Sequence, residues 1–233
     1  MPDLDFQITG VEPATRGLTP LLQFRLRITS ISGREEIQGL LLNAQIQIQS
    51  PQRSYSETEK ERLFELFGPP EQWGQSLRNR LWTHANTAVG AFTGETQVVL
   101  PVLCTFDLNV AATKYFYALE TGDVPLLFLF SGSVFYAGEG GFFQIERIPW
   151  SKECVYRMPV EAWRALMDQQ YPNCAWFYLR RDIFDRLVAF KRRNKLASWD
   201  EAISKLLPIE TTPEAAEVEE KLYEVSGPVE VPV

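Results

Sequence analysis

Apolar and polar residues alternate through much of the first half of the chain. Phe24, Leu26 and Ile28 are separated by single polar residues, and the segment GLLLNAQIQIQ at 39–49 has the same period. Successive side chains of a strand point to opposite faces, so this period predicts strands with one buried face and one solvent face. The Ser32-Gly33 turn signal between the two segments predicts that they pair as one long antiparallel hairpin.

Further segments have the composition of strands, and their number predicts an antiparallel β-sandwich-like or open-barrel region. They are LDFQITG (4–10), TQVVLPVLCTFDL (96–108), VPLLFLFSGSVFY (124–136), FFQIERI (142–148) and ECVYRM (153–158). Because VPLLFLF is apolar on both faces, it is predicted to be a central strand covered on both sides. The alternative is a strand whose second face meets another protein.

A short helical insertion is predicted within this β-rich region, which spans 1–157. Ser56 and Glu59 have the spacing of a capping box, and Gly68 follows the apolar residues of SETEKERLFELFG as a helix stop. The stretch from Pro69 to Ala91 is mixed in composition and is predicted to be loop with some short structure. The insertion is therefore assigned to 56–91.

The period becomes helical after about Pro159. The segments PVEAWRALMDQQY (159–171), RRDIFDRLVAFKRRNK (180–195) and SWDEAISKLL (198–207) each place apolar residues on one stripe or begin with helix-capping residues. Residues 158–208 are therefore predicted to form a helical region that packs on the sheet. Together with the strands this makes an α+β protein.

Most of the net charge of −7 lies at the end of the chain. Residues 209–233 contain seven Glu and one Lys, so this acidic tail carries −6 and residues 1–208 carry about −1. The tail lacks a broad apolar face and is predicted to be disordered, with AAEVEEKLYEV at most a transient helix. The charge of the chain therefore says little about what its folded part binds.

Metal and cofactor chemistry is not indicated by the residue types present. Cys104, Cys154 and Cys174 are widely spaced, and His84 is the one histidine, so the usual zinc or nickel ligand sets are missing. The first residues lack the pattern of a secretory signal, and VPLLFLF is shorter than the about 20 residues of a membrane span. We therefore expect reduced thiols, a cytoplasmic location, no membrane insertion and no cofactor.

The cluster Gly138-x-Gly140-Gly141 is the one motif that invites a catalytic interpretation. A phosphate-binding loop leads from a strand into a helix amino terminus, whereas here a second alternating segment follows and Glu139 would repel an anion. The cluster is therefore predicted to be a β-hairpin turn in which glycine supplies positive φ.

Basic and aromatic residues are the candidates for contacts with a partner. The candidate residues are Trp73, Trp82, Trp176, Arg180, Arg181, Arg186, Lys191, Arg192 and Arg193. Nucleic acid is not favoured, because the body of the chain is not net basic and cations near a helix carboxyl terminus offset its macrodipole. The Glu-rich tail folding back on the basic patch is a further alternative, which salt would weaken.

Several strings resemble an uncharacterised bacterial family of unknown function over nearly all of residues 4–207. They are LFELFG followed by WG, KYFYALETGDVPLLFLFSGSVF, ERIPWSKE, MPVEAWRALMD, LRRDIFDRL and SWDEAI. Members of that family are often encoded beside genes for nickel-iron hydrogenases. The resemblance implies no catalytic residues, and it implies by association an accessory factor in assembly, maturation or docking of such an enzyme.

We therefore expect a non-catalytic interaction protein whose partners include hydrogenase subunits or maturation factors. One alternative is a small-ligand-binding or enzymatic β domain that uses Asp107, Glu146 or His84. Another is a structural subunit of a larger assembly, including an oligomer of identical chains.

Overall fold

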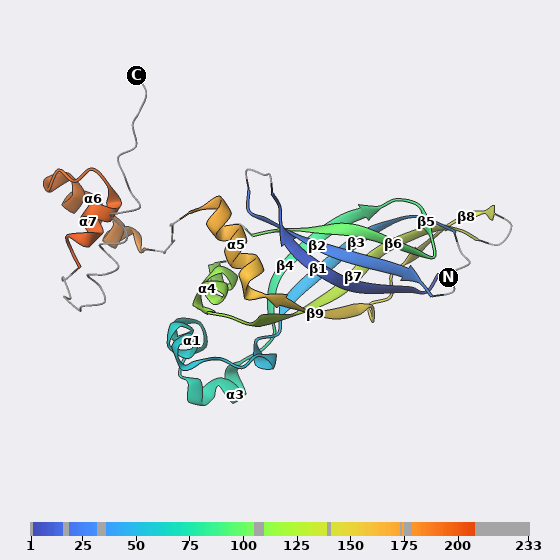
Figure 1. The fold of residues 1–233 in the computed structure, drawn as a ribbon, viewed down its shortest axis with the longest axis horizontal. Coiled ribbons are helices and arrows are strands. Elements are labelled where there is room, and N and C mark those ends of the chain that lie inside the picture. Colours follow the sequence, from blue (N-terminus) through green and yellow to red (C-terminus); the bar gives the residue numbers. More distant parts are fainter. Residues whose placement is uncertain are drawn as a thin grey trace, which may run out of the picture. The chain divides into compact units, whose positions relative to one another are not determined.

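The chain divides into two compact units, residues 1–174 and residues 175–233. The structure is a computed structural model, drawn in Figure 1. It describes residues 2–15, 19–31, 36–104, 110–138, 141–172, 174 and 179–207.

The first unit contains two antiparallel sheets. Its strands are β1 (Leu4–Pro13), β2 (Leu21–Ser30), β3 (Glu36–Ile48), β4 (Arg80–Val89), β5 (Phe92–Thr93), β6 (Glu95–Leu103), β7 (Asp123–Ala137), β8 (Phe143–Arg147) and β9 (Glu153–Pro159). One sheet has the order β1-β2-β6; the other has the order β4-β3-β7-β8, with β5 paired to β3 and β9 to β7. This confirms the predicted α+β class with a sandwich-like region.

The predicted hairpin is wrong, because its two strands lie in different sheets. β2 pairs with β1 and β6, whereas β3 pairs with β4, β5 and β7. Alternation predicted the buried face of each strand correctly, since Phe24, Leu26 and Ile28 are buried. It does not specify the backbone partner, and here the two apolar faces meet across the core instead of side by side. The turn at Ser32-Gly33 lies outside the described residues.

Aromatic rings fill the space between the sheets. Phe24 on β2 lies with its ring centroid 5.3 Å from that of Phe128 on β7 and 6.3 Å from that of Trp82 on β4. Phe6 on β1 stacks on Phe130 at 4.7 Å. All five side chains are buried, so side-chain packing is what joins the two sheets.

β7 is the central strand of the larger sheet, but the described residues do not cover both of its faces. Phe128 and Phe130 point into the core, whereas Leu127 and Leu129 on the other face are only half-buried. Val155, opposite Leu127 on β9, is exposed. The expectation of a strand covered on both sides is therefore not met within the part of the chain that the structure describes.

The helical insertion begins as predicted. α1 (Glu57–Arg62) starts at Ser56, whose hydroxyl accepts from the Glu59 N–H while the Glu59 carboxylate accepts from the Ser56 N–H. α2 (Phe64–Phe67) ends at Gly68, which has a φ of 73°. The 3-10 turns η1 (Ser50–Gln52) and η2 (Pro70–Gln72) and the short α3 (Trp73–Ser76) complete this region.

Besides the two-residue strand β5, two longer elements were not predicted from the sequence. The strand β4 occupies much of the stretch that was assigned as loop, and α4 (Val110–Ala118) lies between β6 and β7. α4 buries Tyr115 and Phe116, and the Phe116 ring lies 5.3 Å from Trp163 of α5 (Val160–Gln170). Figure 1 shows α1, α3, α4 and α5 gathered at one end of the sheets.

The glycine cluster lies between two strands that pair antiparallel, as the hairpin prediction requires. β7 and β8 pair antiparallel, and the Gly138 N–H donates to the carbonyl of Phe142 at 2.8 Å. Gly141 has a φ of 79°, a conformation that glycine adopts readily. Gly140 and Glu139 lie outside the described residues. Since a strand follows the cluster, the geometry of a phosphate-binding loop is not present there.

The second unit contains α6 (Arg181–Arg193) and α7 (Trp199–Ser204). The loop between the two helices is held to α6 by a hydrogen bond from the Lys191 Nζ to the carbonyl of Ala197 at 2.6 Å. The Ser198 hydroxyl caps α7 by accepting from the Glu201 N–H. The predicted helices are therefore present. Residues 208–233, including the acidic tail, lie outside the described residues.

We predict that Phe24→Ala lowers the free energy of unfolding by about 3–5 kcal/mol, because a cavity would open where three rings now meet. Urea denaturation followed by tryptophan fluorescence measures this change. Phe142→Ala is the matched control: Phe142 is 74% exposed, so its truncation is expected to change stability by less than about 0.5 kcal/mol. Equal effects of the two substitutions would contradict the assigned core.

Candidate functional site

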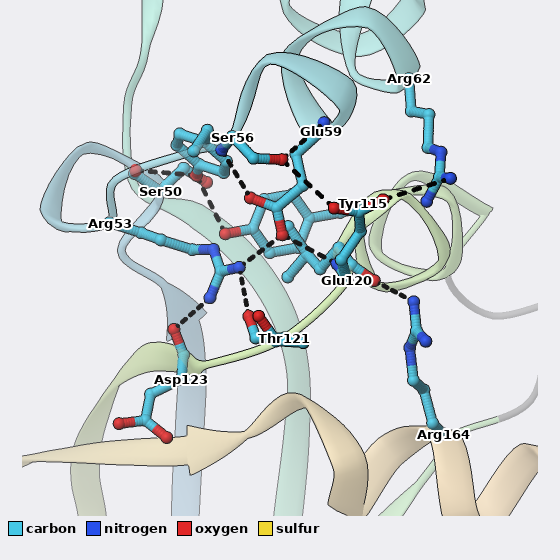
Figure 2. A network of polar contacts seen from close by, with 12 residues as sticks. Ser50, Arg53, Ser56, Glu59, Arg62, Tyr115, Glu120, Thr121, Asp123 and Arg164 are labelled. Carbon is cyan, nitrogen blue, oxygen red and sulfur yellow. Dashed lines mark hydrogen bonds and ion pairs between the residues drawn. The ribbon is translucent and has the colours of Figure 1, made fainter.

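A buried ion pair lies at the helical end of the first unit. The Arg53 guanidinium donates from Nη2 to Glu59 Oε1 at 2.6 Å, and the two side chains are 7% and 4% exposed. Arg53 also donates to the backbone carbonyls of Asp123 at 2.6 Å and Thr121 at 2.7 Å. Figure 2 shows how the pair joins the segment before α1 to the turn between α4 and β7. We call these four residues with Glu120 the Arg53 network.

Glu59 is surrounded by hydrogen-bond donors. Burial alone would raise the pKa of its carboxyl group, but the backbone N–H groups of Glu120 and Ser56, together with Arg53, hold that pKa below its usual value. The N–H of Glu120 lies 2.8 Å from Oε1, and the N–H of Ser56 lies 3.1 Å from Oε2. Glu59 is therefore a stable carboxylate, and its arrangement suits structural support better than proton transfer.

Two tyrosines extend the network into the core. The Tyr55 hydroxyl donates to the Ser50 carbonyl at 2.9 Å and lies 3.0 Å from the hydroxyl of Tyr115. Burial raises the pKa of both tyrosines above the ordinary value. Both phenols therefore stay protonated at neutral pH, as hydrogen-bonding groups rather than nucleophiles.

A hollow of about 560 Å³ opens beside the Arg53 network. Its walls include Gln52, Tyr55, Glu120, Asp123 and Arg157. Arg53 Nε, on its wall, is buried without a hydrogen-bond partner among the described residues, as are Gln49 Oε1 and Ser50 Oγ in the segment before it. Carboxylates and guanidinium groups are mixed on these walls, so the hollow selects neither an anion nor a cation by charge.

A second hollow, of about 550 Å³, lies in the second unit and is largely apolar. We call it the α6–α7 groove. Its lining residues come from both helices and the residues beside them, and they are Leu179, Ile183, Arg186, Leu187, Ala189, Phe190, Arg193, Ile203 and Leu206. None of the 13 residues of α6 is buried by the described residues. The apolar stripe of this helix is therefore left partly open to solvent.

Positive charge surrounds this groove. Residues 179–207 contain eight Lys or Arg and four Asp or Glu, a net charge of +4. Arg186 and Arg193 line the groove with exposed side chains, whereas Arg180 is paired with Asp182 at 2.7 Å. The groove therefore combines an apolar floor with a basic edge, which suits an amphipathic acidic segment.

The structure places the predicted contact residues in different environments. Arg181, Arg192 and Arg193 are exposed on α6, as is Arg186, and Lys191 is half-buried over the Trp199 ring. Trp176 and the alternative candidate Asp107 lie outside the described residues.

The other two tryptophans among the candidates are buried in the first unit. The Trp73 indole N–H donates to the Gly68 carbonyl at 2.9 Å, and its ring packs against Tyr55 and Phe67. Trp82 lies in the core beside Phe24. Their side chains are therefore not on an exposed contact surface, because strand β4 and helix α3 turn both rings inward.

Of the residues proposed for an enzymatic alternative, the two that the structure describes, His84 and Glu146, lie on strands at opposite edges of the larger sheet. His84 is exposed on β4 opposite Gln45, and Glu146 on β8 accepts from the Tyr136 hydroxyl at 3.2 Å. Across the described ranges, no group of three His, Cys, Asp or Glu side chains converges as a metal site requires. Burial raises the pKa of Cys104 to about 12, which keeps this thiol protonated.

Apolar side chains are exposed on the outer face of the larger sheet, the face that the alternative interpretation of VPLLFLF assigned to contact with another protein, although the residues on the neighbouring strands were not identified from the sequence. Leu41, Phe143, Ile145 and Val155 are exposed there on strands β3, β8 and β9. The alternation of each strand identifies its inner face. Which outward-facing apolar residues share one face of the sheet becomes known only from the register between the strands.

The comparison with protein families shows a match over residues 1–215 to a family of unknown function, DUF6084. The chain belongs to this family. The match includes the Arg53 network and the α6–α7 groove and extends past Pro208 into the beginning of the acidic tail, further than the resemblance noted in the sequence. The comparison with curated proteins finds no match. Within the described part of the chain, no helix has the length and apolar character needed to cross a membrane.

We predict that Glu59→Gln lowers the free energy of unfolding by about 3–5 kcal/mol, because it leaves the Arg53 guanidinium buried without a countercharge. Urea denaturation at pH 7 measures the loss. Glu57→Gln is the matched control: Glu57 is 85% exposed and bonded to Lys60, so its change should stay below about 0.5 kcal/mol.

The same variant carries a pH signature. Since the pKa of Glu59 is lower in the folded chain than in the unfolded chain, its contribution is complete above the unfolded value of about 4.3 and is lost as the pH falls through the folded value. The difference between the parent chain and Glu59→Gln should therefore shrink below about pH 4.3. A difference that stays constant down to pH 2 would contradict the assigned ionisation.

Proposed function

We propose that the chain is a non-catalytic interaction protein that binds a helical segment of a protein partner in the α6–α7 groove. The single observation that carries this proposal is an amphipathic helix whose apolar stripe the described residues do not bury. An apolar groove of this kind is the usual receptor for the apolar face of a second helix. Exposed arginines at its edge favour partners with acidic residues beside their apolar anchors.

The partner we propose is a nickel-iron hydrogenase or one of its maturation factors. Support for this comes from the resemblance of the sequence to a family often encoded beside such enzymes. The chain would act as an accessory factor in assembly, maturation or docking. The first unit serves as the folded scaffold, since its aromatic side chains and its buried ion pair are engaged within it.

The test is recovery of hydrogenase subunits with the tagged full-length chain from its native host, grown so that the hydrogenase is present. We expect recovery by the parent chain, at least ten-fold less with Leu187→Asp, and weaker recovery at high salt because the arginines are screened. Val99→Asp on the exposed side of β6 is the matched control and should behave as the parent chain. Circular dichroism checks that both variants remain folded.

Recovery of the chain alone, from cells shown to contain the hydrogenase, would contradict a stable complex. Recovery that is equal for the parent chain and Leu187→Asp would contradict the groove as the contact surface.

A second candidate function, a structural subunit of a larger assembly, is supported by the outer face of the larger sheet. Apolar side chains are exposed at several points along that face, at Leu41, Phe143, Ile145 and Val155. Exposed apolar side chains on one face of a sheet are typical of surfaces that associate. The expected signature is a sedimentation coefficient that rises with protein concentration. Because apolar contacts are not screened by ions, this rise should be the same at low and high salt.

A further inference from the structure

We propose that in the free chain the α6–α7 groove is occupied by the chain's own acidic segment, residues 214–225, which becomes helical on docking. The inference rests on the proposed function in one respect, namely that the groove is a protein-docking surface. It adds a regulatory element: a partner must displace the segment before it can bind.

The segment has the apolar spacing of a helix that lies in a groove. Ala215, Val218, Leu222 and Val225 follow one another at intervals of three, four and three residues, so they share one narrow stripe. Such a stripe is too narrow to stabilise a helix alone, but it is sufficient when a receptor covers it. Pro213 at the start and Gly227 after the end are typical helix boundary residues.

The groove offers a matching stripe. Ile183, Leu187 and Phe190 line it at intervals of four and three residues along α6, and Ile203 and Leu206 line it from the side of α7. Two helices with such stripes pack side by side with their apolar residues interleaved. The lengths also agree, since α6 extends about 20 Å and a 12-residue helix about 18 Å.

The charges of the two partners are opposite. The described residues of the second unit from 179 to 207 carry +4, and the tail from 209 to 233 carries −6. In the docked helix, the positions that flank the stripe hold Glu214 and Glu219 together with Lys221, so two carboxylates and one ammonium group lie beside the edge of the groove. Arg186 and Arg193 are exposed at that edge. Attraction of this kind weakens as salt rises.

The connection is long enough for the segment to fold back. Leu206 lines the groove, and α7 ends with Ser204, so the chain leaves the helix pair beside the site. Six residues lie between Leu207 and Glu214, and the seven residue-to-residue steps span up to about 25 Å when the chain is extended. A tethered segment has a local concentration on the order of millimolar, so even weak docking keeps the groove largely filled.

A partner that binds in this groove therefore competes with the tail and needs the same chemistry, an apolar stripe flanked by carboxylates. Removal of the apolar anchors from the tail should free the groove. The substitutions Val218→Ser and Leu222→Ser do this without changing net charge, and they lie outside the described fold. Val229→Ser and Val231→Ser make the same chemical change outside the docking segment and serve as the matched control.

The experiment measures the binding of a fluorescein-labelled peptide of residues 212–226 to full-length chains by fluorescence anisotropy. We expect Val218→Ser/Leu222→Ser to bind the peptide about ten-fold more tightly than the parent chain, because the parent groove is already occupied. Val229→Ser/Val231→Ser should match the parent chain. Adding Arg186→Glu and Arg193→Glu to the tail variant should weaken peptide binding, as should high salt.

Failure of the peptide to bind Val218→Ser/Leu222→Ser would overturn the proposal, as would equal affinity for this variant and the parent chain. The assay contains no hydrogenase, so its outcome is separate from that of the proposed function. Tight peptide binding without hydrogenase recovery would contradict the hydrogenase as partner and support docking of the tail in the groove. Hydrogenase recovery without peptide binding would support the hydrogenase as partner and contradict docking of the tail.

Discussion

The packing of rings between two sheets that share no strand is the constraint on which the first unit depends. Phe24, Phe128 and Trp82 come from three strands in two separate hydrogen-bonded ladders, and their contacts hold the ladders face to face. Backbone hydrogen bonds stabilise each sheet but cannot join one to the other. The Phe116 ring of α4 then lies 5.0 Å from Trp82, so the helical end is built on the same cluster.

The Arg53 network satisfies backbone hydrogen-bonding groups at that end of the unit, where the chain enters and leaves short helices. Such turns expose backbone carbonyl and N–H groups that the sheets cannot satisfy. Arg53 donates hydrogen bonds to the carbonyls of Thr121 and Asp123, and the Glu59 carboxylate accepts hydrogen bonds from the N–H groups of Ser56 and Glu120. The ion pair between them is thus a connector between two loops, and its buried charges are compensated by each other and by these backbone groups.

The two units differ in how much of their apolar surface is buried. In the first unit, most large side chains at the helical end and between the sheets are covered. In the second, α6 and α7 are too short a pair to bury the stripe of α6 by themselves. This contrast is why we propose an interaction role for the second unit, with the acidic sequence that follows α7 as its ligand in the free chain. Apolar side chains are also exposed on the outer face of the larger sheet.

The sequence by itself determined the type of most elements, their buried faces and their local caps. Alternation identified Phe24, Leu26 and Ile28 as core residues, and the Ser56 and Glu59 spacing identified the start of α1, because such signals depend on residues a few positions apart. The stripe of α6 was equally visible, so half of the candidate groove was predictable. Only the tertiary structure decided that β2 and β3 face each other across the core, that Trp82 lies inside it, and that α7 completes the groove. It also brought to Glu59 the backbone N–H of Glu120, 61 residues away. Strand partners and buried ion pairs are selected by long-range packing, in which many pairings satisfy the same local period and the assembled core selects one of them.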